Sequence, residues 1–226
     1  ASAAIFHSHH FGQAGYHVER LAEQGLVAMV FGNSPQAIAP WGGSAGVFGT
    51  NPIAFAAPRQ SREPLLIDLS LSKVARGKVM LAQQKGESIP EGWALDRNGQ
   101  PTTDPEAALD GTMLPMGDAK GAALVLMVEI LAAAMTGANF GYQASSFFSA
   151  DGPPPNVGQM ILTFDPAFFS GGSYDARLEA LIDTMLSQPE VRLPGTRRME
   201  SRQQSEQRGI SISSELMATL ENLRAN

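Results

Sequence analysis

Apolar positions along the chain form short runs in some places and recur at helical spacing in others, which predicts strands and helices in mixed order. Short runs rich in apolar residues are typical of buried strands. The predicted strands lie at 3–6, 26–31, 53–57, 65–69 and 159–164. The predicted helices, where apolar residues recur at helical spacing or polar residues follow a capping pattern, lie at 15–24, 72–84, 122–135, 174–186 and 214–223.

The segments between these elements differ in character. The stretch 122–135 is the most apolar of the chain, is too short to span a membrane and carries Glu129, so we interpret it as a buried helix. A helix start is predicted at 103–106, where a capping residue precedes proline and acidic side chains. The glycines between 42 and 49 predict a loop whose backbone can approach a ligand, and 137–158 is predicted to be irregular.

Composition limits the functions that the chain can have. Its 226 residues are 43% hydrophobic and 17% charged, which allows a substantial core in one large or two small domains. The net charge of −6 argues against an electrostatic nucleic-acid binder and still permits local positive sites for an anionic substrate. The lack of cysteine excludes disulfides, thiolate catalysis and iron–sulfur clusters, and fits a cytoplasmic protein. No targeting segment or membrane span is apparent.

The four histidines, His7, His9, His10 and His17, all lie within the first 17 residues. Imidazole is suited to acid–base chemistry and to metal ligation near neutral pH. Three interpretations are open. The cluster can bind a metal if a carboxylate such as Asp68 completes the site, or it can satisfy backbone groups at a strand–helix turn. In the third, the segment 10–15 opens a helix and contacts a cofactor phosphate or a reactive carbonyl.

Four further clusters each have a functional and a purely structural interpretation. Asp68-Leu69-Ser70 ends a strand and can hold ribose hydroxyls or cap a helix. The cations within 76–78 can bind a carboxylate or form a solvated helix face. The segment 117–121 places a lysine before a helix but is not a P-loop, and the Gly-x-Gly-x-x-Gly fingerprint is missing. The basic turn 194–198 can hold a phosphate or be ordinary surface charge.

The order of the motifs is more specific than any one of them. The series is Ser8-His9-His10-Phe11-Gly12, Gly49-Thr50-Asn51-Pro52, Asp68-Leu69-Ser70, Ala75-Arg76-Gly77-Lys78, Ile89-Pro90-x-Gly92-Trp93-Ala94, Thr102-Thr103-Asp104-Pro105, Leu114-Pro115-Met116-Gly117-Asp118-Ala119-Lys120-Gly121 and Pro194-Gly195 with Arg197-Arg198. This series resembles the malate/L-lactate dehydrogenase-type family of NAD(P)-dependent oxidoreductases, which includes the Δ1-piperideine-2-carboxylate/Δ1-pyrroline-2-carboxylate reductases. The resemblance covers essentially the whole chain.

The resemblance implies a mixed α+β fold in which helices flank a large, mainly antiparallel sheet with a non-Rossmann NAD(P)-binding site. It implies a cofactor- and substrate-binding core, 1–172, and a C-terminal helical segment, 173–226, that packs back on a helical region preceding this chain. The implied reaction is hydride transfer between NAD(P)H and C2 of a small 2-oxo/2-hydroxy acid or a cyclic 2-imino acid. The implied protein is a cytoplasmic homodimer with an anionic substrate, and NADP is slightly favoured over NAD.

The resemblance also assigns residues to the site. The cofactor is expected to lie along His10, Phe11, Gly12, Gln13 and Ala14. Its nucleotide and phosphates are expected on Asp68, Leu69, Ser70, Ala119, Lys120, Gly195, Arg197 and Arg198. The substrate is expected to face Thr50, Arg76 and Gly77, and no residue is expected to bind a metal.

Two departures from the family pattern bear on the chemistry. Family members carry further N-terminal residues that supply a Ser-His proton relay and a substrate-carboxylate arginine. This chain starts without Met after that region, so we expect a fragment in which His10 is the only imidazole that can take the catalytic role. The second departure is Lys78, which is typical of hydroxy-acid dehydrogenases, whereas 117–123 and 145–148 are closer to the imino-acid reductases. The alternatives are a cofactor-binding or dimerising remnant without activity, and a His-cluster metalloenzyme.

Overall fold

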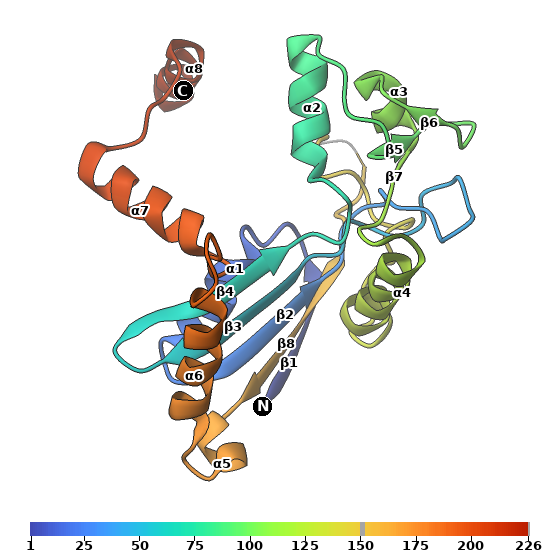
Figure 1. Cartoon of the computed structure of the whole chain (residues 1–226). Coiled ribbons are helices and arrows are strands. Elements are labelled where there is room, and N and C mark those ends of the chain that lie inside the picture. The colour runs from blue at the N-terminus through green and yellow to red at the C-terminus, as the bar shows by residue number, and fades with distance from the viewer. Residues whose placement is uncertain (150–151, 226) are drawn as a thin grey trace.

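A five-stranded antiparallel sheet forms the centre of the computed structural model, which describes residues 1–149 and 152–225 (Figure 1). In spatial order the strands are β1 (Ser2–Ser8), β8 (Val157–Phe164), β2 (Val27–Gly32), β3 (Ile53–Arg59) and β4 (Arg62–Leu69). Every neighbouring pair runs antiparallel, so this sheet contains no parallel βαβ unit of the Rossmann type. The predicted α+β class with an antiparallel sheet is confirmed.

The strand order brings five strand ends to one edge of the sheet. Because neighbours are antiparallel, the carboxyl ends of β1, β2 and β4 lie beside the amino ends of β3 and β8. The segments that leave or enter the sheet there come from distant parts of the sequence. The predicted His-rich loop therefore leaves the sheet at the same edge as the connection between β2 and β3 that contains the glycine-rich stretch, and we call this the loop edge.

Helix α1 (Ala14–Ala22) covers one face of the sheet. The strand residues beneath it are small, with Ala28, Ala54 and Ala56 fully buried against Val18 of the helix. Alternate residues of a strand face the same side, so these alanines form a shallow floor on which a helix can lie close. The close packing fixes where α1 begins, at the loop edge.

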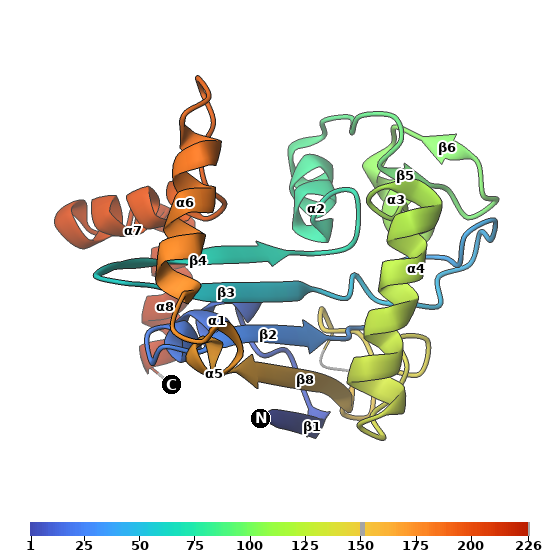
Figure 2. The ribbon, with the colours of Figure 1, turned by 60° about the horizontal axis from the view of Figure 1, so that its bottom comes forward.

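The opposite face is covered only at its two ends (Figure 2). Helix α4 (Asp118–Glu129) and the π-helical turn η1 (Ile130–Ala134) lie at the loop edge, and α5 (Pro166–Ser170) and α6 (Tyr174–Leu186) lie at the other end. The helix predicted at 122–135 is confirmed, but its interpretation as a buried helix is wrong in this chain. Only one side is buried, and Leu126 and Ile130 on the other side are each 47% exposed.

A small lobe stands beside the loop edge. It contains α2 (Arg76–Lys85), α3 (Pro105–Asp110) and a three-stranded sheet of β6 (Pro101–Thr102), β5 (Ala94–Leu95) and β7 (Thr112–Met113). The helix start predicted at 103–106 is confirmed, because the Asp104 side chain accepts a hydrogen bond from the Glu106 N–H. The helix predicted from residue 72 begins only at Arg76, since Ser72 forms a bridge to Pro115 and its hydroxyl bonds to the Val74 carbonyl.

Helices α7 (Thr196–Arg208) and α8 (Ser214–Ala225) project from the β4 side of the sheet (Figure 1). The sequence pattern predicted α8 but missed α7, because α7 is polar on almost every side. An ion pair ties α7 to the body. Both guanidinium nitrogens of Arg202 donate to the two oxygens of Glu19 on α1, at 2.8 Å each, and Glu19 is only 2% exposed.

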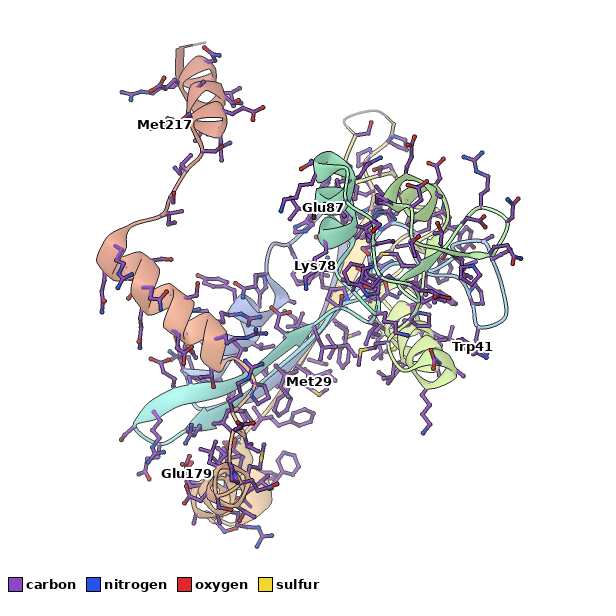
Figure 3. All side chains as sticks on the ribbon, turned by 45° about the horizontal axis from the view of Figure 1, so that its top comes forward. Met29, Trp41, Lys78, Glu87, Glu179 and Met217 are labelled. Carbon is purple, nitrogen blue, oxygen red and sulfur yellow. The ribbon has the colours of Figure 1, made fainter. Side chains whose placement is uncertain are left out.

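Helix α6 is tied to the far end of the sheet in a similar way. Arg59 of β3 donates two hydrogen bonds of 2.7 Å to the Glu179 carboxylate, and the Tyr174 hydroxyl donates to the Pro58 carbonyl. Figure 3 shows Glu179 at the end of the molecule opposite Lys78 of α2. The hydrogen-bonded guanidinium keeps the pKa of the Glu179 carboxyl below its usual range.

The chain exposes more surface than a compact protein of its size. Its accessible surface is 13654 Å², whereas a compact monomer of 24.0 kDa has about 9,900 Å². Much of the excess is apolar and lies on β1, on the outer side of α4, on α5 and on α8. In the described part of the chain, no helix is both long and apolar enough to cross a membrane.

We predict that Arg202→Ala destabilises the protein through Glu19. The change leaves a buried carboxylate without its cation, which we expect to lower the free energy of unfolding by roughly 1–3 kcal/mol, since Arg202 is itself partly exposed. The matched control is Arg20→Ala, which removes an exposed ion pair with Glu23 on the same helix. Urea unfolding measures both, and equal effects of the two changes would contradict the prediction.

Candidate active site

A cavity of about 490 Å³ opens at the loop edge. Its walls come from the loop after β1, the loops flanking β2 and β3, the start of α2 and the segment before β8. The lining residues are His10, Phe11, Gly12, Asn33, Ser34, Pro35, Gln36, Ala37, Thr50, Pro52, Arg76, Ala144, Ser146, Phe147 and Phe148. The structure thus brings together residues expected to contact the cofactor and residues expected to face the substrate. Their roles stay predictions.

The His-rich loop is held by its own backbone. The Gly12 N–H donates to His10 Nδ1 at 3.0 Å, so a neutral His10 ring carries its proton on Nε2. The rings of His9 and His10 lie 5.0 and 5.4 Å from the Phe147 ring, which joins this loop to the segment before β8. His17 bonds through Nε2 to the Phe11 carbonyl at 3.0 Å, so its contact is a structural one.

Arg76 supplies a cation in the cavity wall. It is the first residue of α2, is half-buried, and has its guanidinium carbon 5.9 Å from the centre of the Phe148 ring. One nitrogen donates to the Leu109 carbonyl at 3.3 Å. Within residues 1–149 and 152–225 no carboxylate pairs with it, and burial lowers the pKa of the guanidinium. A half-buried arginine without a counterion favours an anionic ligand.

Asp68 connects the sheet to two helices. Its Oδ2 accepts a 3.0 Å hydrogen bond from the Gly15 N–H at the start of α1 and a 3.2 Å bond from Arg198 of α7. Asp68 therefore caps a helix, as one of its two interpretations predicted, and the helix is α1, which lies far from Asp68 in sequence. A side chain at Gly15 would lie 2.7 Å from Asp68 Oδ2 and 2.8 Å from Arg198 Nη1, so a larger residue would displace the Asp68–Arg198 ion pair.

A second cleft, also of about 490 Å³, lies at the turn before α7. It is lined by Arg192, Leu193, Pro194, Gly195, Arg197 and Arg198. Gly195 has a φ of 87°, and a side chain on it would lie 2.9 Å from the Leu66 carbonyl oxygen of β4. Arg198 Nη1 is buried and has no hydrogen-bond partner. The segment 10–15 runs from the first cavity to Asp68, and Asp68 contacts Arg198 of this cleft.

Some expected site residues lie elsewhere. Ala119 and Lys120 are exposed in the first turn of α4 and line neither the cavity nor the cleft. Lys120 is therefore inside the helix rather than before it. Gln13 is the residue before α1 and Ala14 is buried at its start. Gly77 has open space around it, and the Ser70 hydroxyl bonds to that of Ser72 at 3.1 Å. Leu69 is 37% exposed at the end of β4.

The motif analysis named the segments 49–52 and 145–148 but missed the roles of their residues Asn51, Phe147 and Phe148 in shaping the cavity. Asn33 and Asn51 are buried polar side chains that bond to Glu129, and Phe147 and Phe148 close the cavity. A local signal for the network behind the cavity was Glu129, a charged residue inside the most apolar helix. In the part of the chain that the structure describes, no three His, Asp or Glu side chains gather closely enough to hold a metal.

Comparisons with known proteins identify the family and the fold. The sequence profile described as malate/L-lactate dehydrogenase matches residues 1–221. A (2R)-3-sulfolactate dehydrogenase (NADP(+)) of Chromohalobacter salexigens is 62% identical over 211 residues, which are 93% of this chain and 62% of that protein. The chain spans between 62% and 66% of the length of this and two further curated relatives.

Solved structures share the fold. The Δ1-piperideine-2-carboxylate reductase of Pseudomonas syringae has a TM-score of 0.89 and 40% identity, and the match covers 99% of this chain and 68% of that one. A sulfolactate dehydrogenase of Methanocaldococcus jannaschii has a TM-score of 0.85 and 32% identity, covering 98% of this chain and 65% of that one. The profile match over nearly the whole length and the shared antiparallel sheet show that this chain belongs to the malate/L-lactate dehydrogenase family.

Proposed function

We propose that this chain carries the cofactor and substrate site of an NADP(H)-dependent oxidoreductase. The reaction is hydride transfer between the nicotinamide and C2 of a small 2-oxo/2-hydroxy acid. The observation that carries the proposal is the Arg76 guanidinium, which has no counterion in the described chain and shares one cavity with Thr50 and the loop 10–12. A 2-hydroxy acid needs a cation for its carboxylate beside the place where its C2 meets the cofactor.

The substrate end of the proposed site is built on α2. Arg76 offers two parallel N–H donors to a carboxylate, and Gly77 beside it has no side chain to obstruct the ligand. Thr50 lines the same cavity, and its N–H bonds to the Ser34 hydroxyl at 3.1 Å. This arrangement leaves the Thr50 side chain free to orient the substrate.

The residues present fit a dinucleotide. The segment 10–14 contains Gly12, which lines the cavity and has no side chain, so a nicotinamide ring can approach the backbone there. Three arginines line the cleft at Gly195, and their guanidinium groups supply the positive charge and the donors that a phosphate needs. Bound NAD(P)H would supply the hydride. The number of cations favours NADP over NAD, and Leu69, Ser70, Ala119 and Lys120 stay predicted contacts of the nucleotide.

His10 is the proposed partner of the reacting group. Because Gly12 donates to Nδ1, the neutral ring presents Nε2–H, which can donate a hydrogen bond to the oxygen on C2. In this tautomer the ring polarises a carbonyl, and the proton that completes the reduction comes from another group or from water.

The substrate class proposed first is a 2-hydroxy acid. The 62% identical relative is a sulfolactate dehydrogenase by name, and Lys78 is exposed on α2 next to Gly77. A cyclic 2-imino acid is the alternative, supported by reductases that are 39–42% identical. A panel of 3-sulfolactate, malate, lactate and Δ1-piperideine-2-carboxylate with both cofactors separates the two classes.

We also propose the organisation that the resemblance implies, with a core at 1–172 and a helical segment at 173–226 that packs on helices preceding this chain, in a homodimer. The uncovered apolar side chains of α8 support it, with Leu216, Met217 and Leu220 each at least 44% exposed. A chain that binds cofactor without turnover is the second candidate, because it spans only 62% of the length of the sulfolactate dehydrogenase. Activity of the 226-residue chain distinguishes these outcomes.

We predict that NADPH binds and that Arg198→Ala weakens the binding by about tenfold or more, since a charge-assisted hydrogen bond is lost. The enhancement of NADPH fluorescence on titration measures this, with Arg20→Ala as the control on an exposed arginine of α1. No fluorescence change at millimolar NADPH with the unaltered chain would refute the cofactor assignment.

We predict that Arg76→Met weakens the binding of oxamate, a 2-oxo acid analogue, by about tenfold or more, because the cavity loses the one arginine among its described lining residues. Calorimetric titration in the presence of NADPH measures the affinity. Lys85→Met, at the other end of the same helix, is the matched control and should bind oxamate normally. Equal affinities of the Arg76 and Lys85 variants would rule out the proposed carboxylate contact.

A further inference from the structure

Glu129 is a buried carboxylate directly behind the cavity wall. It is the last residue of α4, is 3% exposed, and forms no ion pair within the described residues. Its Oε2 accepts from the Asn51 amide at 2.7 Å, and its Oε1 accepts from the Gly141 N–H at 2.7 Å and from the Asn33 amide at 3.4 Å. The Gly49 N–H is a fourth donor.

These four donors belong to three segments that form the cavity wall. Asn33 begins the loop that supplies lining residues up to Ala37, and Gly49 and Asn51 flank Thr50. Gly141 precedes the lining residues between Ala144 and Phe148. One carboxylate therefore holds together segments that are far apart in sequence, and each segment contributes to the surface that a ligand would contact.

The groups around the Glu129 carboxylate all donate hydrogen bonds, so the side chain at this position must accept them. The N–H groups of Gly49 and Gly141 can only donate. The Asn51 amide is fixed as a donor because its Nδ2 also bonds to the Val125 carbonyl at 3.1 Å. An ionised carboxylate satisfies all of these donors, whereas a protonated acid or an amide turns a hydrogen of its own toward one of them.

The three segments are also packed too closely to rearrange easily. A side chain at Gly141 would lie 2.8 Å from the Gly49 nitrogen and 3.0 Å from the Ser34 carbonyl oxygen. The π turn η1 starts immediately after Glu129, and its Ala132 carbonyl lies against Gly158 of β8. The Gly158 N–H in turn donates to Asn33 Oδ1 at 2.9 Å, so the network continues into the sheet.

We propose that Glu129 is a positioning residue, whose ionised carboxylate sets the place of Thr50 and of the facing wall 144–148 for ligand binding. The assignment of a ligand to this wall rests on the proposed function. Burial raises the pKa of Glu129, and no charged side chain of α4, η1, β8 or the three segments contributes to that pKa. Acidification should therefore neutralise Glu129 at a higher pH than an exposed glutamate, and the wall should loosen.

The test compares Glu129→Gln, Glu129→Asp and the control Glu179→Gln in the full chain. Glu179→Gln removes a carboxylate at the far end of the sheet, outside the proposed site. Oxamate affinity with NADPH is measured from pH 5 to pH 8. We expect Glu129→Gln to bind oxamate on the order of tenfold more weakly near pH 8. We expect Glu129→Asp to recover part of this loss, because it keeps the charge and the acceptors.

The pH profile separates positioning from a general loss of stability. The oxamate affinity of the unaltered chain, divided by that of Glu129→Gln, should fall toward one as the pH falls. The same ratio taken with Glu179→Gln should stay constant. His10 and Arg76 line the cavity in all of these proteins, so their contribution to oxamate binding is common to both affinities in each ratio. A ratio to Glu129→Gln that does not change with pH, or equal losses in both glutamine variants, would overturn the inference.

Hydrogen exchange makes failure of this inference distinguishable from failure of the proposed function. If the unaltered chain binds neither NADPH nor oxamate, the proposed function is wrong. The amides of 33–36, 49–51 and 139–144 still report on Glu129, and they should exchange faster in Glu129→Gln and at low pH after correction for intrinsic rates. Unchanged protection there would overturn the role of Glu129 by itself. If Glu129→Gln does not fold, amide exchange in Glu129→Asp and in the unaltered chain at low and high pH decides the role of Glu129 instead.

Discussion

The antiparallel pairing of five strands is the constraint on which the rest of the structure depends. It places the ends of β1, β2 and β4 beside the starts of β3 and β8, and the cavity opens where these ends meet. A parallel sheet would send alternate loops to opposite edges or need helical crossovers between them. Here the long connections between β2 and β3 and between β4 and β8 leave and re-enter the sheet at the same edge, and residues as distant as His10 and Phe148 line one space.

Polar groups, more than apolar ones, fix the loops at that edge. The two core clusters hold the helices on the sheet and on the small lobe. The loops themselves are joined by Glu129 with its amide donors and by Asp68 with Gly15 and Arg198. Hydrogen bonds have strict distances and directions, so these carboxylates specify where a backbone lies more sharply than apolar contact does. Both carboxylates lie at segments that a ligand of the proposed kind would contact.

Much of the fold could be predicted from local patterns, and the site only in part. Apolar runs located the strands, and capping chemistry located the start of α3 at Asp104. Helix α7 was missed because an ion pair to buried Glu19, rather than an apolar stripe, holds it in place. The motif resemblance assigned His10, Thr50 and Arg76 to the site, and all three line one cavity in the structure. The roles of Asn51 and Glu129 depend on contacts between distant residues, and no local spacing encodes such contacts.

The large exposed surface has a thermodynamic consequence. An unfolded chain of 24.0 kDa exposes about 35,000 Å², so folding removes only about 60% of the surface, the fraction expected for a domain of about 60 residues. The heat-capacity change and the denaturant sensitivity of unfolding both scale with the surface removed from water. Per residue, this chain should therefore show a smaller heat-capacity change and a smaller denaturant sensitivity than a compact protein of its length, and any molecule that covers β1 and α4 would raise both.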